Sequence, residues 1–167
     1  MRLLSAGWRI ARRTLRAKAA RRRGTPLAPP DAVTTVLLVD DDPGVRFALT
    51  EVLRDRGYRV IPASSGTQAL ALLAGVDVVV TDYSMPGMDG LELTSQIAAR
   101  IPGLPVILVT AHGSEQLVRI ASSRGACSCL SKPFDIDEIG RVIEHARTSH
   151  AAPSPGPAGP AGDEPLK

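Results

Sequence analysis

Short apolar runs and helical patterns of apolar residues alternate along the middle of the chain. Apolar runs of strand length occur at 36–39, 58–61, 76–81, 105–110 and 127–131. Between and after them, apolar residues recur at helical spacing, which predicts helices over 43–56, 65–73, 90–101, 114–123 and 135–147. This regular alternation predicts one α/β domain with a parallel sheet over residues 33–148.

The central predicted strands are apolar at nearly every position, as in VDVVV at 76–80 and PVILV at 105–109. A strand of this kind is typical of a sheet that helices cover on both faces. In such open α/β sheets, ligands bind in the crevice at the carboxyl ends of the strands. The residues that follow each predicted strand are therefore the first candidates for a functional site.

Carboxylates, hydroxyls and an ammonium group follow four of the predicted strands. Because the carboxyl ends of parallel strands meet at one edge of a sheet, we expect these side chains to lie together. Each also has a plainer interpretation when taken alone, and Asp42 before Pro43 has the position of a helix N-cap. The candidates are Asp40, Asp41 and Asp42 after the first strand, Asp82 after the third, Thr110 after the fourth, and Ser131 and Lys132 after the fifth.

Such a set of side chains suits phosphoryl transfer. Crowded carboxylates raise one another's pKa, and a hard divalent cation with oxygen ligands, expected to be Mg²⁺, would relieve the repulsion. Asp82 would be the nucleophile that forms an acyl phosphate. The cation and Lys132 would neutralise the phosphoryl oxygens, and the Thr110 hydroxyl would hydrogen-bond one of them.

Four strings in register carry a family resemblance over residues 34–148: VLLVDDDP, VVVTDYSMPGMDG, PVILVTAHG and CLSKPF. Together they resemble the receiver domains of two-component response regulators, the CheY-like receiver family. The resemblance implies a (βα)5 doubly wound, flavodoxin-like sheet in the order 2-1-3-4-5. It also implies roles for single residues: Asp82 is the phosphoacceptor, and Asp40 and Asp41 are the acidic pair. The direct Mg²⁺ ligands would be Asp41, Asp82 and the Ser84 carbonyl. Thr110 would be the switch hydroxyl, and Lys132, which precedes a cis Pro133, would be the phosphate-pairing lysine.

The function implied by the resemblance is that of a stand-alone cytoplasmic receiver, phosphorylated by a sensor histidine kinase or a histidine phosphotransfer protein. It would be no enzyme beyond its own aspartyl phosphorylation and dephosphorylation. No DNA-binding, ATPase or cyclase segment is recognised after residue 150, so output is expected through protein contacts or a phosphorelay, with an unknown target. One alternative is a receiver-like binding module that works without phosphate. Another is a haloacid dehalogenase-type phosphatase with Asp40 as nucleophile and Asp42 as acid.

Cys129 departs from the family pattern. It lies three residues before Lys132, where the family usually has Tyr or Phe, so the resemblance does not extend to the aromatic that usually couples the site to output. Cys127 and Cys129 stand two residues apart on a predicted strand, which would point both side chains the same way, about 6–7 Å apart. That spacing is too wide for a disulfide, and we expect two reduced thiols.

Charge separates the ends of the chain from its middle. Residues 1–30 hold nine Lys or Arg and no acid, whereas the rest carries 11 basic and 17 acidic residues, a balance of −6. The basic segment 1–32 has an apolar stripe of Leu4, Trp8, Ala11 and Leu15, which would suit an anionic membrane or nucleic acid. A transit-like peptide, a disordered arm and a start codon placed too early are the alternatives. Residues 149–167 are rich in Pro, Gly and Ala and are expected to be disordered.

Overall fold

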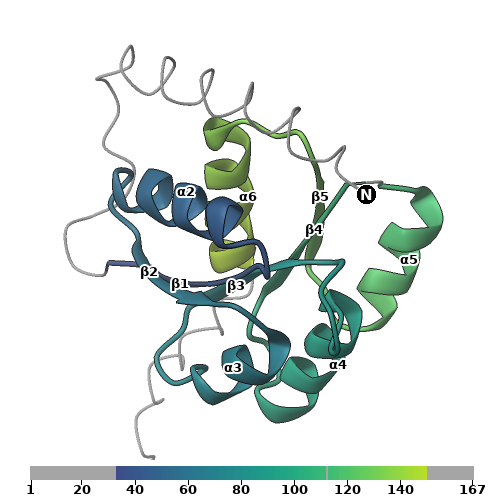
Figure 1. Ribbon diagram of the computed structural model, residues 1–167. Coiled ribbons are helices and arrows are strands. Elements are labelled where there is room, and N and C mark those ends of the chain that lie inside the picture. Colours follow the sequence, from purple (N-terminus) through teal and green to yellow (C-terminus); the bar gives the residue numbers. More distant parts are fainter. Residues whose placement is uncertain (1–32, 112, 150–167) are drawn as a thin grey trace, which may run out of the picture.

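Strands and helices alternate through the whole computed structural model, which describes residues 33–111 and 113–149 (Figure 1). Every predicted element is present, and its ends differ from the prediction by only a few residues. The predicted basic segment 1–32, and the predicted tail after Ser149, lie outside the described residues. The strands are β1 (Thr35–Val39), β2 (Arg59–Ala63), β3 (Val78–Asp82), β4 (Val106–Thr110) and β5 (Ser128–Ser131). The helices are α2 (Pro43–Arg54), α3 (Gly66–Ala71), α4 (Gly90–Arg100), α5 (Glu115–Ser123) and α6 (Ile136–Ser149).

The five strands form one parallel sheet in the order β2-β1-β3-β4-β5. This confirms the predicted doubly wound, flavodoxin-like topology. Helices α2 and α6 cover one face of the sheet, and α3, α4 and α5 cover the other (Figure 1). None of the described helices is long and apolar enough to cross a membrane.

Neighbouring residues of the central strands divide between two cores. Val36 and Leu38 of β1 pack under α2 and α6, whereas Leu37 and Val39 pack under α3 and α4. This division requires both alternate sets of strand residues to be apolar, which explains why the sequence runs are apolar throughout. The helices contribute the rest of the two cores, mainly Leu49, Leu53, Ile139 and Ile143 on one face and Ala69, Leu93 and Ile97 on the other.

Strand β2 continues through Pro62 and ends at Ala63, although the predicted strand stopped at Ile61. Arg59 donates to the Thr34 carbonyl and Ala63 accepts from the Asp40 N–H, on either side of β1, so the backbone groups of the alternate residues Val60 and Pro62 point to the free edge of the sheet. Proline is tolerated there because no ladder hydrogen bond needs its missing N–H. Arg54 of α2 donates to the Val60 carbonyl over 3.3 Å, so this edge offers few free groups to another strand.

Candidate functional site

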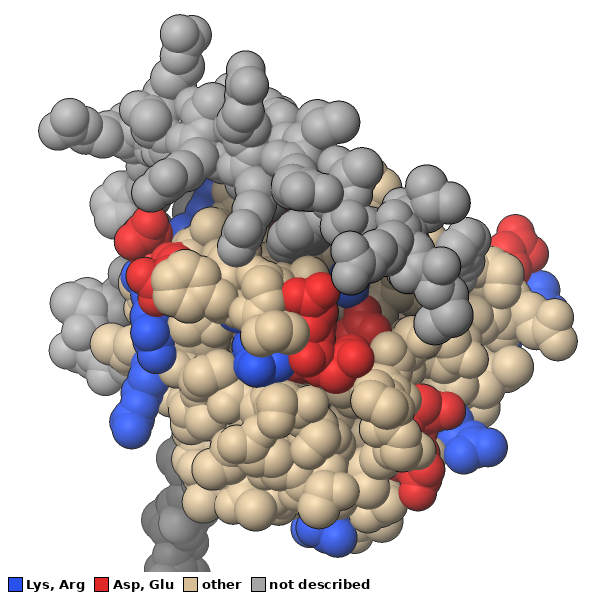
Figure 2. Space-filling model, viewed as in Figure 1, with Lys and Arg blue, Asp and Glu red and all other residues tan. Residues whose placement is uncertain are grey.

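Lys132 joins the carboxyl ends of β1 and β3. Its Nζ lies 2.5 Å from Oδ1 of Asp82 and 3.5 Å from Oδ2 of Asp40. The Asp40 side chain is only 6% exposed and that of Asp82 11%, so both carboxylates are largely withdrawn from water. Figure 2 shows acidic side chains gathered near the middle of the molecule, beside basic ones. The structure thus brings together the predicted phosphoacceptor, one member of the acidic pair and the lysine.

Burial and neighbouring charges of opposite sign act in opposite directions on the pKa values of Asp40 and Lys132. Burial, together with the nearby charge of Asp82, raises the pKa of Asp40 to about 6, although Lys132 acts in the opposite direction. Burial disfavours the charged form of Lys132, but its hydrogen bond to Asp82 and the charges of both carboxylates outweigh this and raise its pKa. Burial therefore outweighs the single lysine in setting the pKa of Asp40.

Backbone and side-chain donors fix the two buried carboxylates. Asp40 accepts a hydrogen bond at Oδ1 from the N–H of Asp42, over 2.9 Å. Asp82 accepts one at Oδ2 from the N–H of Ser84, also over 2.9 Å, so its two oxygens are held by different partners. Arg46, which the sequence did not single out, donates to the Asp40 backbone carbonyl over 2.5 Å. An arginine in the first turn of the helix that follows the acidic run was the available signal for this contact.

Asp42 caps helix α2, as predicted. Its Oδ1 accepts from the N–H groups of Gly44 and Val45 over 2.7 and 2.9 Å, and Pro43 occupies the first turn. The same holds at α6, where Asp135 accepts from the N–H of Glu138 over 2.8 Å. Asp42 is therefore engaged in helix capping, and this argues against its role as the acid of a phosphatase-type site.

Thr110 and Lys132 meet at the ends of β4 and β5. The Lys132 N–H donates to the Thr110 carbonyl over 2.7 Å, and Thr110 is 3% exposed. The Lys132–Pro133 peptide bond is cis, as the resemblance implied. Four of the predicted site residues, Asp40, Asp82, Thr110 and Lys132, thus lie at one edge of the sheet.

Comparison with known proteins decides the family. The sequence profile of the response regulator receiver domain matches residues 36–144, which is more than half of the chain. The chain belongs to the response regulator receiver domain family. The match includes every residue of the site described above.

Individual relatives of this receiver are of two kinds. It is 43% identical over 113 residues to the DNA-binding transcriptional regulator NtrC of Salmonella typhimurium, covering 66% of this chain and 24% of that protein. It is 38% identical over 111 residues to sporulation initiation phosphotransferase F of Bacillus subtilis, covering 65% of this chain and 90% of that protein. The chain spans about a quarter of the length of the transcriptional regulators that it matches. Among solved structures, the response regulator TrrA of Thermotoga maritima, in complex with Mg²⁺ and BeF, has a TM-score of 0.62 at 31% identity, over 68% of this chain and 99% of that one.

The oxygen donors of the receiver suit the Mg²⁺ ion that the family implies. Asp40 and Asp82 lie close enough to share Lys132, and the Ser84 backbone adjoins Asp82. Asp41 is exposed, however. Within residues 33–111 and 113–149, no group of three or more His, Cys, Asp or Glu side chains is gathered closely enough to hold a metal ion. The chemistry of the donors fits the ion, and the full ligand set stays a prediction.

The two cysteines of the receiver are free, as expected, but for a different reason than the one given above. Cys127 packs against the cluster under α2 and α6, whereas Cys129 packs against the cluster under α5, so the two side chains do not share a face. Strand alternation does not apply because β5 begins only at Ser128. The Cys127 thiol donates to the Val106 carbonyl over 3.2 Å, and burial raises the pKa of both thiols.

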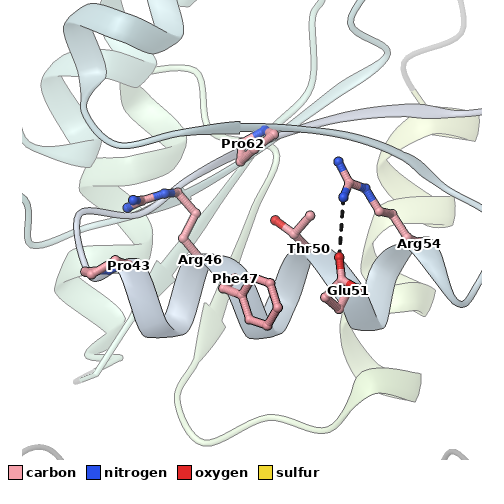
Figure 3. A pocket seen from close by; sticks show the side chains of 7 residues that line it. All are labelled: Pro43, Arg46, Phe47, Thr50, Glu51, Arg54 and Pro62. Carbon is pink, nitrogen blue, oxygen red and sulfur yellow. Dashed lines mark hydrogen bonds and ion pairs between the residues drawn. The ribbon is translucent and has the colours of Figure 1, made fainter.

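A shallow groove of about 320 Å³ lies between α2 and the free edge of β2 (Figure 3). The ring of Phe47, which is 64% exposed, stands on its rim, and Arg46 and Arg54 lie on either side. The Thr50 hydroxyl is buried among the lining residues and has no hydrogen-bond partner in the described part of the chain. None of the four site residues lines this groove, although Arg46, which donates to the Asp40 carbonyl, does.

Proposed function

We propose that this receiver accepts a phosphoryl group on Asp82 from the phosphohistidine of a histidine kinase or a histidine phosphotransfer protein. The observation that carries the proposal is the position of Lys132 Nζ, 2.5 Å from Asp82 and 3.5 Å from Asp40. A nucleophilic carboxylate, a second carboxylate and a cation are thus held at one point, as phosphoryl transfer requires. The receiver modifies itself and turns over no separate substrate.

In the proposed step, a carboxylate oxygen of Asp82 attacks the phosphorus of the donor. A new O–P bond forms, the P–N bond of the phosphohistidine breaks, and the released imidazole nitrogen takes up a proton. Lys132 offsets negative charge on the phosphoryl oxygens, and the Thr110 hydroxyl offers a hydrogen bond to one of them. A bound Mg²⁺ ion, held by Asp40, Asp41, Asp82 and the Ser84 carbonyl, would supply further positive charge to the phosphoryl oxygens.

The output that we propose is transfer of the phosphoryl group onward, or a protein contact that phosphorylation controls. One relative, of whose length this receiver covers 90%, is named a sporulation initiation phosphotransferase. That name supports a relay. The NtrC relatives are DNA-binding transcriptional regulators, but the receiver matches only 24% of their length. The predicted stand-alone, cytoplasmic state belongs with this proposal.

Labelling with acetyl phosphate, a small acyl-phosphate donor, tests the proposed function. With Mg²⁺ present, the wild-type protein should incorporate phosphate and Asp82→Asn should incorporate none, because an amide is a poor nucleophile. Asp55→Asn is the matched control, because Asp55 is an exposed carboxylate at the end of α2, away from the site. Lys132→Met should retain the nucleophile but slow the labelling. Equal labelling of wild type and Asp82→Asn would refute the assignment.

A further inference from the structure

The apolar cluster beneath α5 is small. Its buried members are Leu108 of β4, Ala121 of α5 and Ala126, two of which are alanines. Ala121 is the one buried residue of α5, and Val118 and Ile120 on the same helix are 44% and 39% exposed. Because few apolar contacts hold α5 to the sheet, displacing this helix costs little free energy.

Tyr83 supplies the aromatic ring of this cluster. It packs against the buried members together with Leu91 of α4, Leu117 of α5 and Cys129 of β5. No other aromatic residue in the described part of the chain does so: Tyr58 and Phe134 belong to the cluster on the opposite face, and Phe47 is exposed on α2. Family members usually have an aromatic ring on the last strand, where this chain has Cys129. Here the ring of Tyr83, in the loop between β3 and α4, packs against the cluster beneath α5 instead.

The backbone of Tyr83 is tightly placed directly after the phosphoacceptor. Its N–H donates to the Val109 carbonyl over 2.7 Å, and its carbonyl accepts from the Gly90 N–H over 2.9 Å. A Cβ at Gly90 would lie 2.4 Å from the Asp82 carbonyl and 2.9 Å from the Tyr83 Cα, so α4 is closely packed against these two residues. A displacement of the Asp82 backbone is therefore passed to Tyr83 rather than absorbed by a loose loop.

We propose that Tyr83 is the positioning residue through which a phosphoryl group on Asp82 shifts α5. The inference rests on the proposed function. When Asp82 carries the larger phosphoryl group, the backbone of residues 82–84 adjusts, and the Tyr83 ring moves against Leu117 and Leu91. Because α5 is weakly held, this movement changes its packing without a flip of an aromatic side chain on β5.

Hydrogen–deuterium exchange over Glu115–Ser123, with and without Mg²⁺ and beryllofluoride, tests the proposal. Beryllofluoride mimics the phosphoryl group on an aspartate. The wild type should show a change in exchange across α5, and Tyr83→Leu should reduce that change about threefold or more, since leucine is apolar but shorter than the ring. Tyr83→Phe keeps the ring and should keep the response. Tyr58→Phe is the matched control on the opposite face and should leave the response unchanged.

A rescue variant separates coupling from simple loss of packing. Adding Cys129→Tyr to Tyr83→Leu returns a ring to the cluster and should restore most of the α5 response. A full response in Tyr83→Leu would overturn the inference, as would the absence of any α5 response in a wild type that acetyl phosphate labels on Asp82. A wild type that cannot be labelled at all would instead overturn the proposed function, and the inference with it.

Discussion

The Tyr58 hydroxyl, just before β2, donates a hydrogen bond over 3.1 Å to Oε1 of Glu144 on α6. This contact connects the loop after α2 to the last helix, and Glu144 is paired in turn with Arg147 over 3.0 Å. Burial and the neighbouring charge of Glu144 raise the pKa of Tyr58 from 10.0 to about 12. The folded protein therefore holds the phenolic proton more tightly than the unfolded chain does.

Alkaline stability should depend on this tyrosine. Since the folded pKa lies above the unfolded one, the stabilisation is complete below pH 10 and is lost as the pH rises through about 12. Tyr58→Phe should lower the free energy of unfolding by about 1 kcal/mol at pH 8, where the hydrogen bond is intact. The difference between variant and wild type, measured by urea unfolding from pH 8 to 11.5, should shrink as the pH rises. A difference that stays constant over this range would contradict the account.

Neutralising Asp40 should stabilise the protein in the absence of divalent cations. The pKa of this carboxyl is raised from 3.8 to about 6, so its protonation favours the folded state. This contribution to the free energy of unfolding is complete below pH 4 and is lost as the pH rises through 6. Asp40→Asn retains an oxygen acceptor for the Asp42 N–H and should raise the free energy of unfolding at pH 8 by on the order of 2 kcal/mol.

The measurement is urea unfolding in a chelator at pH 8 and pH 5, where the gain from Asp40→Asn should be small at the lower pH. Asp41→Asn is the control, because Asp41 carries the same charge but is exposed. A loss of stability in Asp40→Asn at pH 8 would mean that its ion pair with Lys132 outweighs the cost of burial.

Two buried helical threonines should respond oppositely to the same substitution. The Thr50 hydroxyl has no partner within the described residues, whereas that of Thr94 donates to the Gly90 carbonyl over 2.6 Å. Thr50→Val should raise the free energy of unfolding by about 1 kcal/mol, and Thr94→Val should lower it by a similar amount. Thermal and urea unfolding measure both. Equal destabilisation by the two variants would show that the Thr50 hydroxyl is satisfied in solution.

A ring placed at residue 129 should enlarge the switch response of the wild type. Cys129 is half-buried and much smaller than the Tyr or Phe usual there, so it fills little of the space that Thr110 would leave on moving toward a phosphoryl group. We expect Cys129→Tyr to increase the NMR shift changes that beryllofluoride causes across residues 113–134. An unchanged response would show that the size of the side chain at residue 129 does not limit the switch. Cys129→Ala is the control for loss of the thiol alone.

Much of this architecture could be predicted because it depends on local patterns. The apolar strands, the caps at Asp42 and Asp135, and the meeting of Asp40, Asp82, Thr110 and Lys132 all follow from residue order and from the geometry of a parallel sheet. Each of these features needs only the near sequence and the rule that strand ends share an edge.

Features that depend on tertiary placement were missed. Pro62 lies inside β2 because that strand is at an edge, which no local pattern states. Cys127 and Cys129 pack on different faces because β5 begins only at Ser128, which leaves Cys127 outside the strand and its alternation. The contact of Arg46 with the Asp40 carbonyl depends on how α2 packs beside the site.

Mapping the acyl phosphate directly tests the central claim. After incubation with acetyl phosphate and Mg²⁺, the aspartyl phosphate can be trapped by borohydride reduction and located by tandem mass spectrometry of the digested protein. The account predicts a single modified residue, Asp82, held between Lys132 and the Ser84 N–H. Modification at Asp40 with Asp82 intact, or no modification at any aspartate, would contradict it.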